Sequence, residues 1–86
     1  MKILVIEDKV SLTDAIAEYL KQKKNIVTIK NDGEKGFVEA RDEIYDVIVL
    51  DIMLPHKNGL DILKDLRANK NETPIILLIY LIHFYV

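Results

Sequence analysis

Two short apolar segments of this sequence each end directly on acidic residues. Segment 47–50 is followed by Asp51, and segment 3–6 is followed by Glu7 and Asp8. Short apolar runs of this kind are typical of strands that are buried on both faces, as in a parallel sheet. Parallel α/β sheets carry their functional groups just beyond the carboxyl ends of the strands. The sequence therefore predicts chemistry at the place where these two strands end.

A cluster of three carboxylates limits the chemistry that is possible there. Like charges this close repel one another, so the cluster needs either raised pKa values or a divalent cation. Oxygen ligands without His or Cys suit a hard ion and favour Mg²⁺ over transition metals. One carboxylate could then act as a nucleophile towards phosphorus. Taken alone, Glu7 and Asp8 would more often be a solvated strand end or a helix-capping turn, and Asp51 would start a turn. Together, at the two strand ends, they favour the metal site.

Strands and helices are predicted to alternate along the chain. The predicted strands are residues 2–6, 26–30, 46–50 and 74–80, and the predicted helices are residues 11–23, 32–41 and 60–69. Ser11 and Asp14 resemble a capping pair at the start of the first helix. Alternating strands and helices with right-handed crossovers indicate the α/β class. We predict a flavodoxin-like doubly wound parallel sheet that is incomplete, with about four strands in the order 2-1-3-4. In that order the first and third strands are neighbours, so their terminal acids converge in one crevice.

Length, charge and composition exclude several classes of protein. Eighty-six residues allow one small domain, and a formal net charge of −2 gives no signature for binding nucleic acid or an anionic membrane. The absence of cysteine suits a reducing cytoplasm, which is the location we expect. The apolar run 3–6 is too short for a signal peptide, and the uncharged run 75–86 is too short to span a bilayer as a helix.

Three motifs resemble one protein family. They are KILVIED at residues 2–8, DIMLPHKNGLDIL at residues 51–63 and TPIILL at residues 73–78. Together, at these spacings, they resemble the receiver domain of bacterial two-component response regulators, above all those attached to winged-helix DNA-binding domains. The resemblance covers residues 1–78 in register.

The resemblance implies a role for each residue at the sheet edge. Asp51 is expected to be the phosphoacceptor. Glu7, Asp8 and Asp51, with the backbone carbonyl of Met53, are expected to bind Mg²⁺ or Mn²⁺. A histidine kinase is the implied phosphodonor, and no direct contact of this fragment with nucleic acid or a membrane is expected. Such a module is not an enzyme beyond slow self-phosphorylation and autodephosphorylation.

The chain also departs from the family's pattern near its C-terminal end. Ile79 stands where the family has a Thr or Ser that hydrogen-bonds the phosphoryl group, and Tyr80 stands where it has a small residue. The family's fifth strand with its phosphate-binding lysine, its last two helices and an effector domain have no counterpart here. We therefore expect a C-terminally truncated receiver at residues 1–78, defective in switching, followed by an atypical apolar tail at residues 79–86.

Two other functional classes remain open at this stage. A hydrolase of the phosphatase or dehalogenase type would also use an Asp after a parallel strand, but it needs a second acid two residues later, where this chain has Met53. The other alternative is a non-catalytic remnant that forms a homo-oligomer through residues 74–86, unless that tail folds back over its own sheet. His56 and Lys57 are interpreted as exposed residues of a loop tip.

Overall fold

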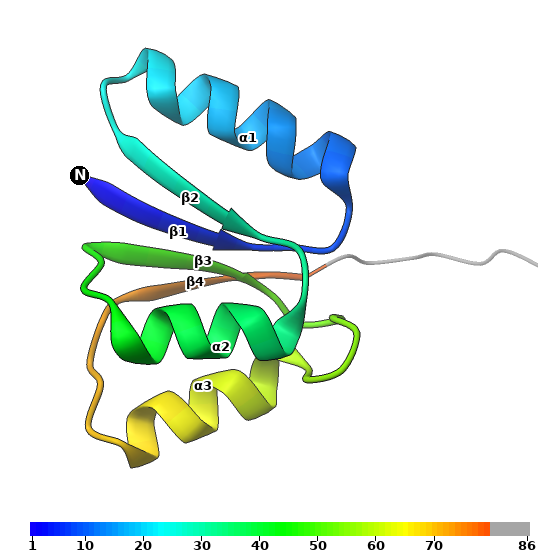
Figure 1. Ribbon diagram of the computed structural model, residues 1–86, viewed down its shortest axis with the longest axis vertical. Helices are drawn as coiled ribbons and strands as arrows, with labels where there is room; N and C mark the ends of the chain where they lie inside the picture. The colour runs from blue at the N-terminus through cyan, green and yellow to red at the C-terminus, as the bar shows by residue number, and fades with distance from the viewer. Residues whose placement is uncertain (80–86) are drawn as a thin grey trace, which may run out of the picture.

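The computed structural model describes residues 1–79, in which strands and helices alternate as predicted (Figure 1). The elements are β1 (Lys2–Ile6), α1 (Val10–Gln22), β2 (Ile26–Lys30), α2 (Gly33–Asp42), β3 (Val47–Asp51), α3 (Gly59–Ala68) and β4 (Ile75–Leu78). The predicted bounds of β1 and β2 are confirmed, and the other elements differ from prediction by one or two residues at their ends.

The four strands form one parallel sheet in the order β2-β1-β3-β4. This confirms the predicted flavodoxin-like strand order. The register pairs Ile6 of β1 with Leu50 of β3, so the residues that follow these two positions meet at the same edge of the sheet. The order of the strands and their register thus place Glu7 beside Asp51.

The sheet lies between two helical layers (Figure 1). α1 covers one face, and α2 and α3 cover the other. Alternate side chains of the two central strands are completely buried in one cluster with side chains of α2, α3 and the segment before β3. This cluster contains Leu4, Ile6, Ala40, Tyr45, Ile48, Leu50, Ile62 and Leu66. It anchors both strands whose ends carry the acids.

Side-chain caps set the starts of α2 and α3. Asp32 accepts a hydrogen bond from the Lys35 amide (3.0 Å), and Asn58 accepts one from the Asp61 amide (2.9 Å). The start of α1 was predicted wrongly. Lys9 occupies the N-cap position without a side-chain cap, so Ser11 does not begin the helix.

β4 is an edge strand and is shorter than predicted. Its ladder begins at Ile75, because Pro74 has no N–H to donate and contributes only its carbonyl, which accepts from Ile48 (2.9 Å). Ile76 is 56 % exposed, and Ile79, after the strand, is 63 % exposed. Residues 80–86 lie outside the described residues, and with them most of the predicted tail, so the boundary expected between residues 1–78 and 79–86 stays a prediction. No helix within residues 1–79 is long and apolar enough to cross a membrane.

Candidate metal centre

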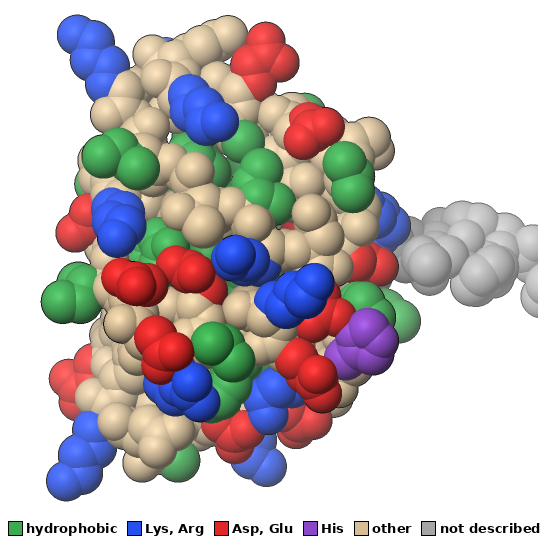
Figure 2. Space-filling view, viewed as in Figure 1, with side chains coloured by type: hydrophobic (Ala, Val, Ile, Leu, Met, Phe, Trp, Pro, Cys, Tyr) green, Lys and Arg blue, Asp and Glu red, His purple; other side chains and the backbone are tan. Residues whose placement is uncertain are grey.

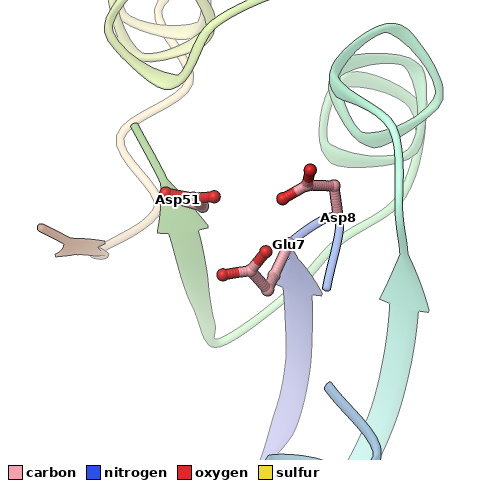
Figure 3. Close-up of side chains that lie close together, drawn as sticks. All are labelled: Glu7, Asp8 and Asp51. Atoms are coloured by element: carbon pink, nitrogen blue, oxygen red, sulfur yellow. The ribbon is translucent and has the colours of Figure 1, made fainter. Parts of the chain in front are cut away.

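The carboxyl ends of β1 and β3 bring the three predicted acids together. Glu7 and Asp8 directly follow β1, and Asp51 is the last residue of β3. Each offers an oxygen, and these three oxygens lie within 4.8 Å of one another. Figure 3 shows the side chains of Glu7 and Asp8 directed towards that of Asp51 across the gap between the two strand ends. The predicted convergence is confirmed.

Hydrogen bonds from the backbone fix two of the three carboxylates. Glu7, which is buried, accepts a bond from the Lys9 amide at Oε2 (2.8 Å). Asp51 accepts one from the Met53 amide at Oδ1 (3.1 Å). Its other oxygen, Oδ2, is buried and has no hydrogen-bond partner within residues 1–79. A buried carboxylate oxygen that lacks a donor calls for a proton or a cation beside it.

Burial and like charge both act on the ionisation of this cluster. Burial raises the pKa of Asp51, and the charges of Glu7 and Asp8 raise it further, against the lowering effect of the Met53 amide. The pKa of Asp8 is raised chiefly by its hydrogen bond with Glu7. The charged forms of Asp51 and Asp8 are therefore disfavoured when no cation is beside them. A hard divalent cation would reverse this balance, and the donor set, which is oxygen only, fits Mg²⁺.

Gly59 allows α3 to start directly against the end of β3. A Cβ atom on this residue would lie 2.2 Å from the carbonyl oxygen of Asp51, which is impossible without a shift of the backbone. The Gly59 amide instead donates to the carbonyl of Ile52 (2.8 Å) and closes the base of the loop formed by residues 52–58. Met53 belongs to this loop, and its side chain is exposed. The role of its carbonyl as a ligand stays a prediction.

Asn31, which none of the predicted motifs includes, supports the site. The side-chain amide of Asn31 donates to the carbonyl of Glu7 (2.7 Å) and lies 3.3 Å from the hydroxyl of Thr13, which is buried in α1. Asn31 thus ties the end of β1 to α1. A signal for it was present, because Asn31 follows β2, and β2 ends at the same edge of the sheet as β1.

Two loop residues that were interpreted as merely exposed have partners. Lys57 is largely buried and contacts the carboxylate of Asp65 through its ammonium group, which also lies 4.9 Å from the centre of the Phe37 ring. His56 is exposed, but its Nδ1 contacts Oδ2 of Asp32. The interpretation was wrong for Lys57 and incomplete for His56.

Comparisons with known proteins agree with this geometry. The family model of the response regulator receiver domain matches residues 3–80. Over 78 residues the chain is 38 % identical to the transcriptional regulatory protein CiaR of Streptococcus pneumoniae and 42 % identical to the transcriptional regulatory protein DltR of Streptococcus agalactiae. These matches cover 91 % of this chain but 34 % and 35 % of the two relatives. The chain therefore spans about a third of the length of these curated relatives.

Solved structures show the same fold. A receiver domain of the Francisella response regulator 1452 has a TM-score of 0.86 at 32 % identity, with 88 % of this chain and 63 % of that chain covered. The receiver domain of the sensor histidine kinase PA1611 from Pseudomonas aeruginosa has a TM-score of 0.83 at 31 % identity, with 88 % and 64 % covered. That second structure has a magnesium ion coordinated in its active-site cleft.

The charge cluster predicts that Asp51→Asn stabilises the metal-free protein. The substitution removes the single negative charge of Asp51, which is repelled by Glu7 and Asp8 and is shared by the unpartnered Oδ2, so we expect the free energy of unfolding at pH 7 to rise by roughly 1 kcal/mol. Because folding raises the pKa of Asp51 above 3.8, the charge disfavours the folded state only as the pH rises above that value. The gain should accordingly fade towards pH 3.8. Urea denaturation in the presence of EDTA measures this gain in stability. Asp14→Asn, on the exposed side of α1, is the control. An Asp51→Asn variant that is no more stable than wild type at pH 7 would contradict the prediction.

Proposed function

This chain belongs to the family of two-component response regulator receiver domains, and from that premise we propose that Asp51 accepts a phosphoryl group while Glu7, Asp8 and Asp51 bind Mg²⁺. One observation carries the proposal. Oδ2 of Asp51 is buried without a hydrogen-bond donor in the described part of the chain, and it belongs to a group of three carboxylates with oxygens within 4.8 Å of one another. Because no hydrogen bond within residues 1–79 occupies this oxygen, it is available to a cation or to phosphorus.

The backbone prepares Asp51 for this role. The Met53 amide holds Oδ1 and so restricts rotation of the carboxylate, while Oδ2 has no hydrogen-bond donor among residues 1–79. Glu7 and Asp8 supply negative charge from the neighbouring strand, and we include the Met53 carbonyl as a further ligand. Mg²⁺ bound by this set would neutralise charge on the oxygens of an incoming phosphoryl group. Receiver domains receive that group from a histidine kinase, which we propose as the partner of this chain.

The hydrolase alternative finds no support at the site. A hydrolase of the phosphatase or dehalogenase type needs a general acid two residues after the nucleophile, and Met53 occupies that position. Its side chain is exposed and carries no proton donor. The family to which the chain belongs has a signalling role, so we do not propose enzymatic turnover of a substrate.

The wider role that we propose is control of transcription from the cytoplasm. CiaR and DltR are named as transcriptional regulatory proteins, and the matched region is about a third of each. Figure 2 shows acidic and basic side chains intermixed over α2 and α3 rather than gathered into a basic patch on that face. With a formal net charge of −2, we expect residues 1–86 by themselves to make no direct contact with DNA.

Metal binding is the first test of the proposal. A ligand that binds only the folded state stabilises it by mass action, so Mg²⁺ or Mn²⁺ at about 100 times its dissociation constant should add roughly 2–3 kcal/mol to the free energy of unfolding. Thermal denaturation with and without the ion measures this effect. Asp8→Ala and Asp51→Asn should reduce it strongly, while Asp14→Asn should leave it unchanged. A folded wild-type protein whose melting temperature does not change with either ion would refute the metal site.

Phosphorylation of Asp51 is expected to be slow and to cause little conformational change. Ile79 follows β4 at the position where the family has a hydroxyl residue, and its side chain is mostly exposed and can donate no hydrogen bond. A positioned donor contributes a few kcal/mol to the stabilisation of a transferring group. Incubation with a small phosphodonor, followed by intact-mass spectrometry, should show slow labelling of wild type and none of Asp51→Asn. Ile79→Thr should be labelled faster. Rapid, stoichiometric labelling of wild type with large chemical-shift changes after residue 73 would contradict this.

We also propose that the chain self-associates through residues 74–86, an inference that the exposed part of β4 favours. Among residues 1–79, β4 is the last strand at one edge of the sheet, and Ile76 and Ile79 expose apolar surface there. Sedimentation should show a dimer or larger assembly for wild type and a monomer for Ile76→Lys. Ile26→Lys is a matched control, because Ile26 is also an exposed isoleucine and lies on β2, the opposite edge strand. A monodisperse wild-type monomer at micromolar concentration would rule the assembly out.

A further inference from the structure

The loop of residues 52–58 is attached to the N-terminal end of α2 by contacts that the metal-site proposal does not use. The amide of Gly33, the first residue of α2, donates to the carbonyl of Pro55 (3.2 Å). His56 contacts the side chain of Asp32. The ammonium group of Lys57 lies over the ring of Phe37. Three successive residues of the loop therefore contact α2 or its cap.

The approach of the loop to α2 is so close that only glycine fits at the contact. A Cβ atom on Gly33 would lie 1.9 Å from the carbonyl oxygen of Lys57 and 2.8 Å from its carbonyl carbon. Both of these are backbone atoms, so a side chain would push the loop away. The carbonyl of Pro55 also accepts from the Lys57 amide (2.8 Å), which turns the loop tightly at this contact.

The two carboxylate oxygens of Asp32 have different tasks. Oδ1 caps α2 by accepting from the Lys35 amide (3.0 Å), while Oδ2 contacts Nδ1 of His56. His56 has a positive φ of 69°, a conformation that is uncommon for residues with a side chain. Such conformations persist where the surroundings hold them in place. The contact with Asp32 is an interaction that holds His56 there.

The electrostatics of the pair favour its charged form. The hydrogen bond and charge of Asp32 raise the pKa of His56, with a smaller contribution from Glu34 and an opposing one from Lys35. The pKa of Asp32 is lowered, chiefly by the Lys35 amide and then by His56. On the neighbouring elements, Lys57 is paired with Asp65 of α3. Because the pKa of His56 is raised, the stabilisation from the imidazolium is complete below the unfolded value of 6.5 and is lost as the pH rises through the folded value.

We propose that His56 and Asp32 form a clasp that holds the loop of residues 52–58 against α2 and so positions the Met53 carbonyl next to the acidic cluster. The inference rests on the proposed function, because it concerns a ligand of the same metal. Hydrogen bonds already close the base of the loop, from Gly59 to Ile52 and from Met53 to Asp51. The clasp fixes the opposite side of the loop, three residues beyond Met53. His56 and Asp32 act here as positioning residues and do not touch the metal.

A titration of Mg²⁺ into the full chain and its variants tests the clasp. His56→Asn keeps a residue that tolerates positive φ but cannot carry the charge, and Asp32→Asn keeps a cap for α2. We expect each to weaken Mg²⁺ binding about three- to fivefold at pH 6.5, as the loss of one ion pair near the surface would. The double variant should be no weaker than either single one. At pH 9 His56 is neutral in wild type as well, so the difference in Mg²⁺ affinity between wild type and His56→Asn should shrink. A loss of packing alone would leave that difference the same at both pH values.

Arg41→Gln with Asp42→Asn is the matched control, because that pair lies at the other end of α2. It should leave Mg²⁺ affinity unchanged. Hydrogen exchange of the Gly33 amide gives a readout that needs no metal, and it should be faster in His56→Asn than in the control.

Wild-type Mg²⁺ affinity in His56→Asn at pH 6.5 would overturn the clasp while leaving the proposed function standing. A wild-type chain that binds no Mg²⁺ would instead refute the proposed function. In that case the exchange of the Gly33 amide in His56→Asn still tests the clasp. Exchange at the rate of the control would overturn the clasp as well, and faster exchange would support the contact between the loop and α2.

Discussion

Electrostatic repulsion between carboxylates at the ends of two neighbouring parallel strands is the constraint on which this structure depends. β1 and β3 lie side by side in the sheet, and each delivers its acids to the same edge. The fold tolerates this arrangement because buried apolar side chains of both strands pack against α2 and α3. Packing free energy from the core thus holds together charges that would otherwise separate. In the function we propose, a bound cation relieves that repulsion.

The amides around the cluster limit its movement, and the charge of Lys9 offsets only part of the repulsion within it. Backbone amides of Met53 and Lys9 hold Asp51 and Glu7, and Asn31 holds the carbonyl of Glu7. All of these are neutral donors. They reduce the rotational freedom of the carboxylates and add no positive charge of their own. The contact between His56 and Asp32 extends the same support to the loop beyond β3.

The sequence pattern was sufficient for the fold and for the convergence of the three acids, because both follow from local signals. Short apolar runs predicted β1 and β3, and the predicted order of the strands made these two neighbours, so that their carboxyl ends lie together. The pattern was insufficient where a side chain finds a partner far away in the chain. Asn31 reaches Glu7 and Lys57 reaches Asp65 and Phe37 through contacts that no periodicity encodes. The wrong start of α1 has a local origin instead: the Glu7 carboxylate holds the Lys9 amide, and the helix begins after Lys9 without a side-chain cap.

The position of a bound paramagnetic ion tests the central claim most directly. Mn²⁺ at substoichiometric concentration broadens the amide resonances of nearby residues, so its location can be read along the chain. If the carboxylates of Glu7, Asp8 and Asp51 bind the ion, broadening will be greatest at residues 7–9 and 51–53 and will be absent from the far end of the sheet, near Asn71. Broadening that instead follows the exposed acids of α2 and α3, or that persists unchanged in Asp51→Asn, would contradict the account.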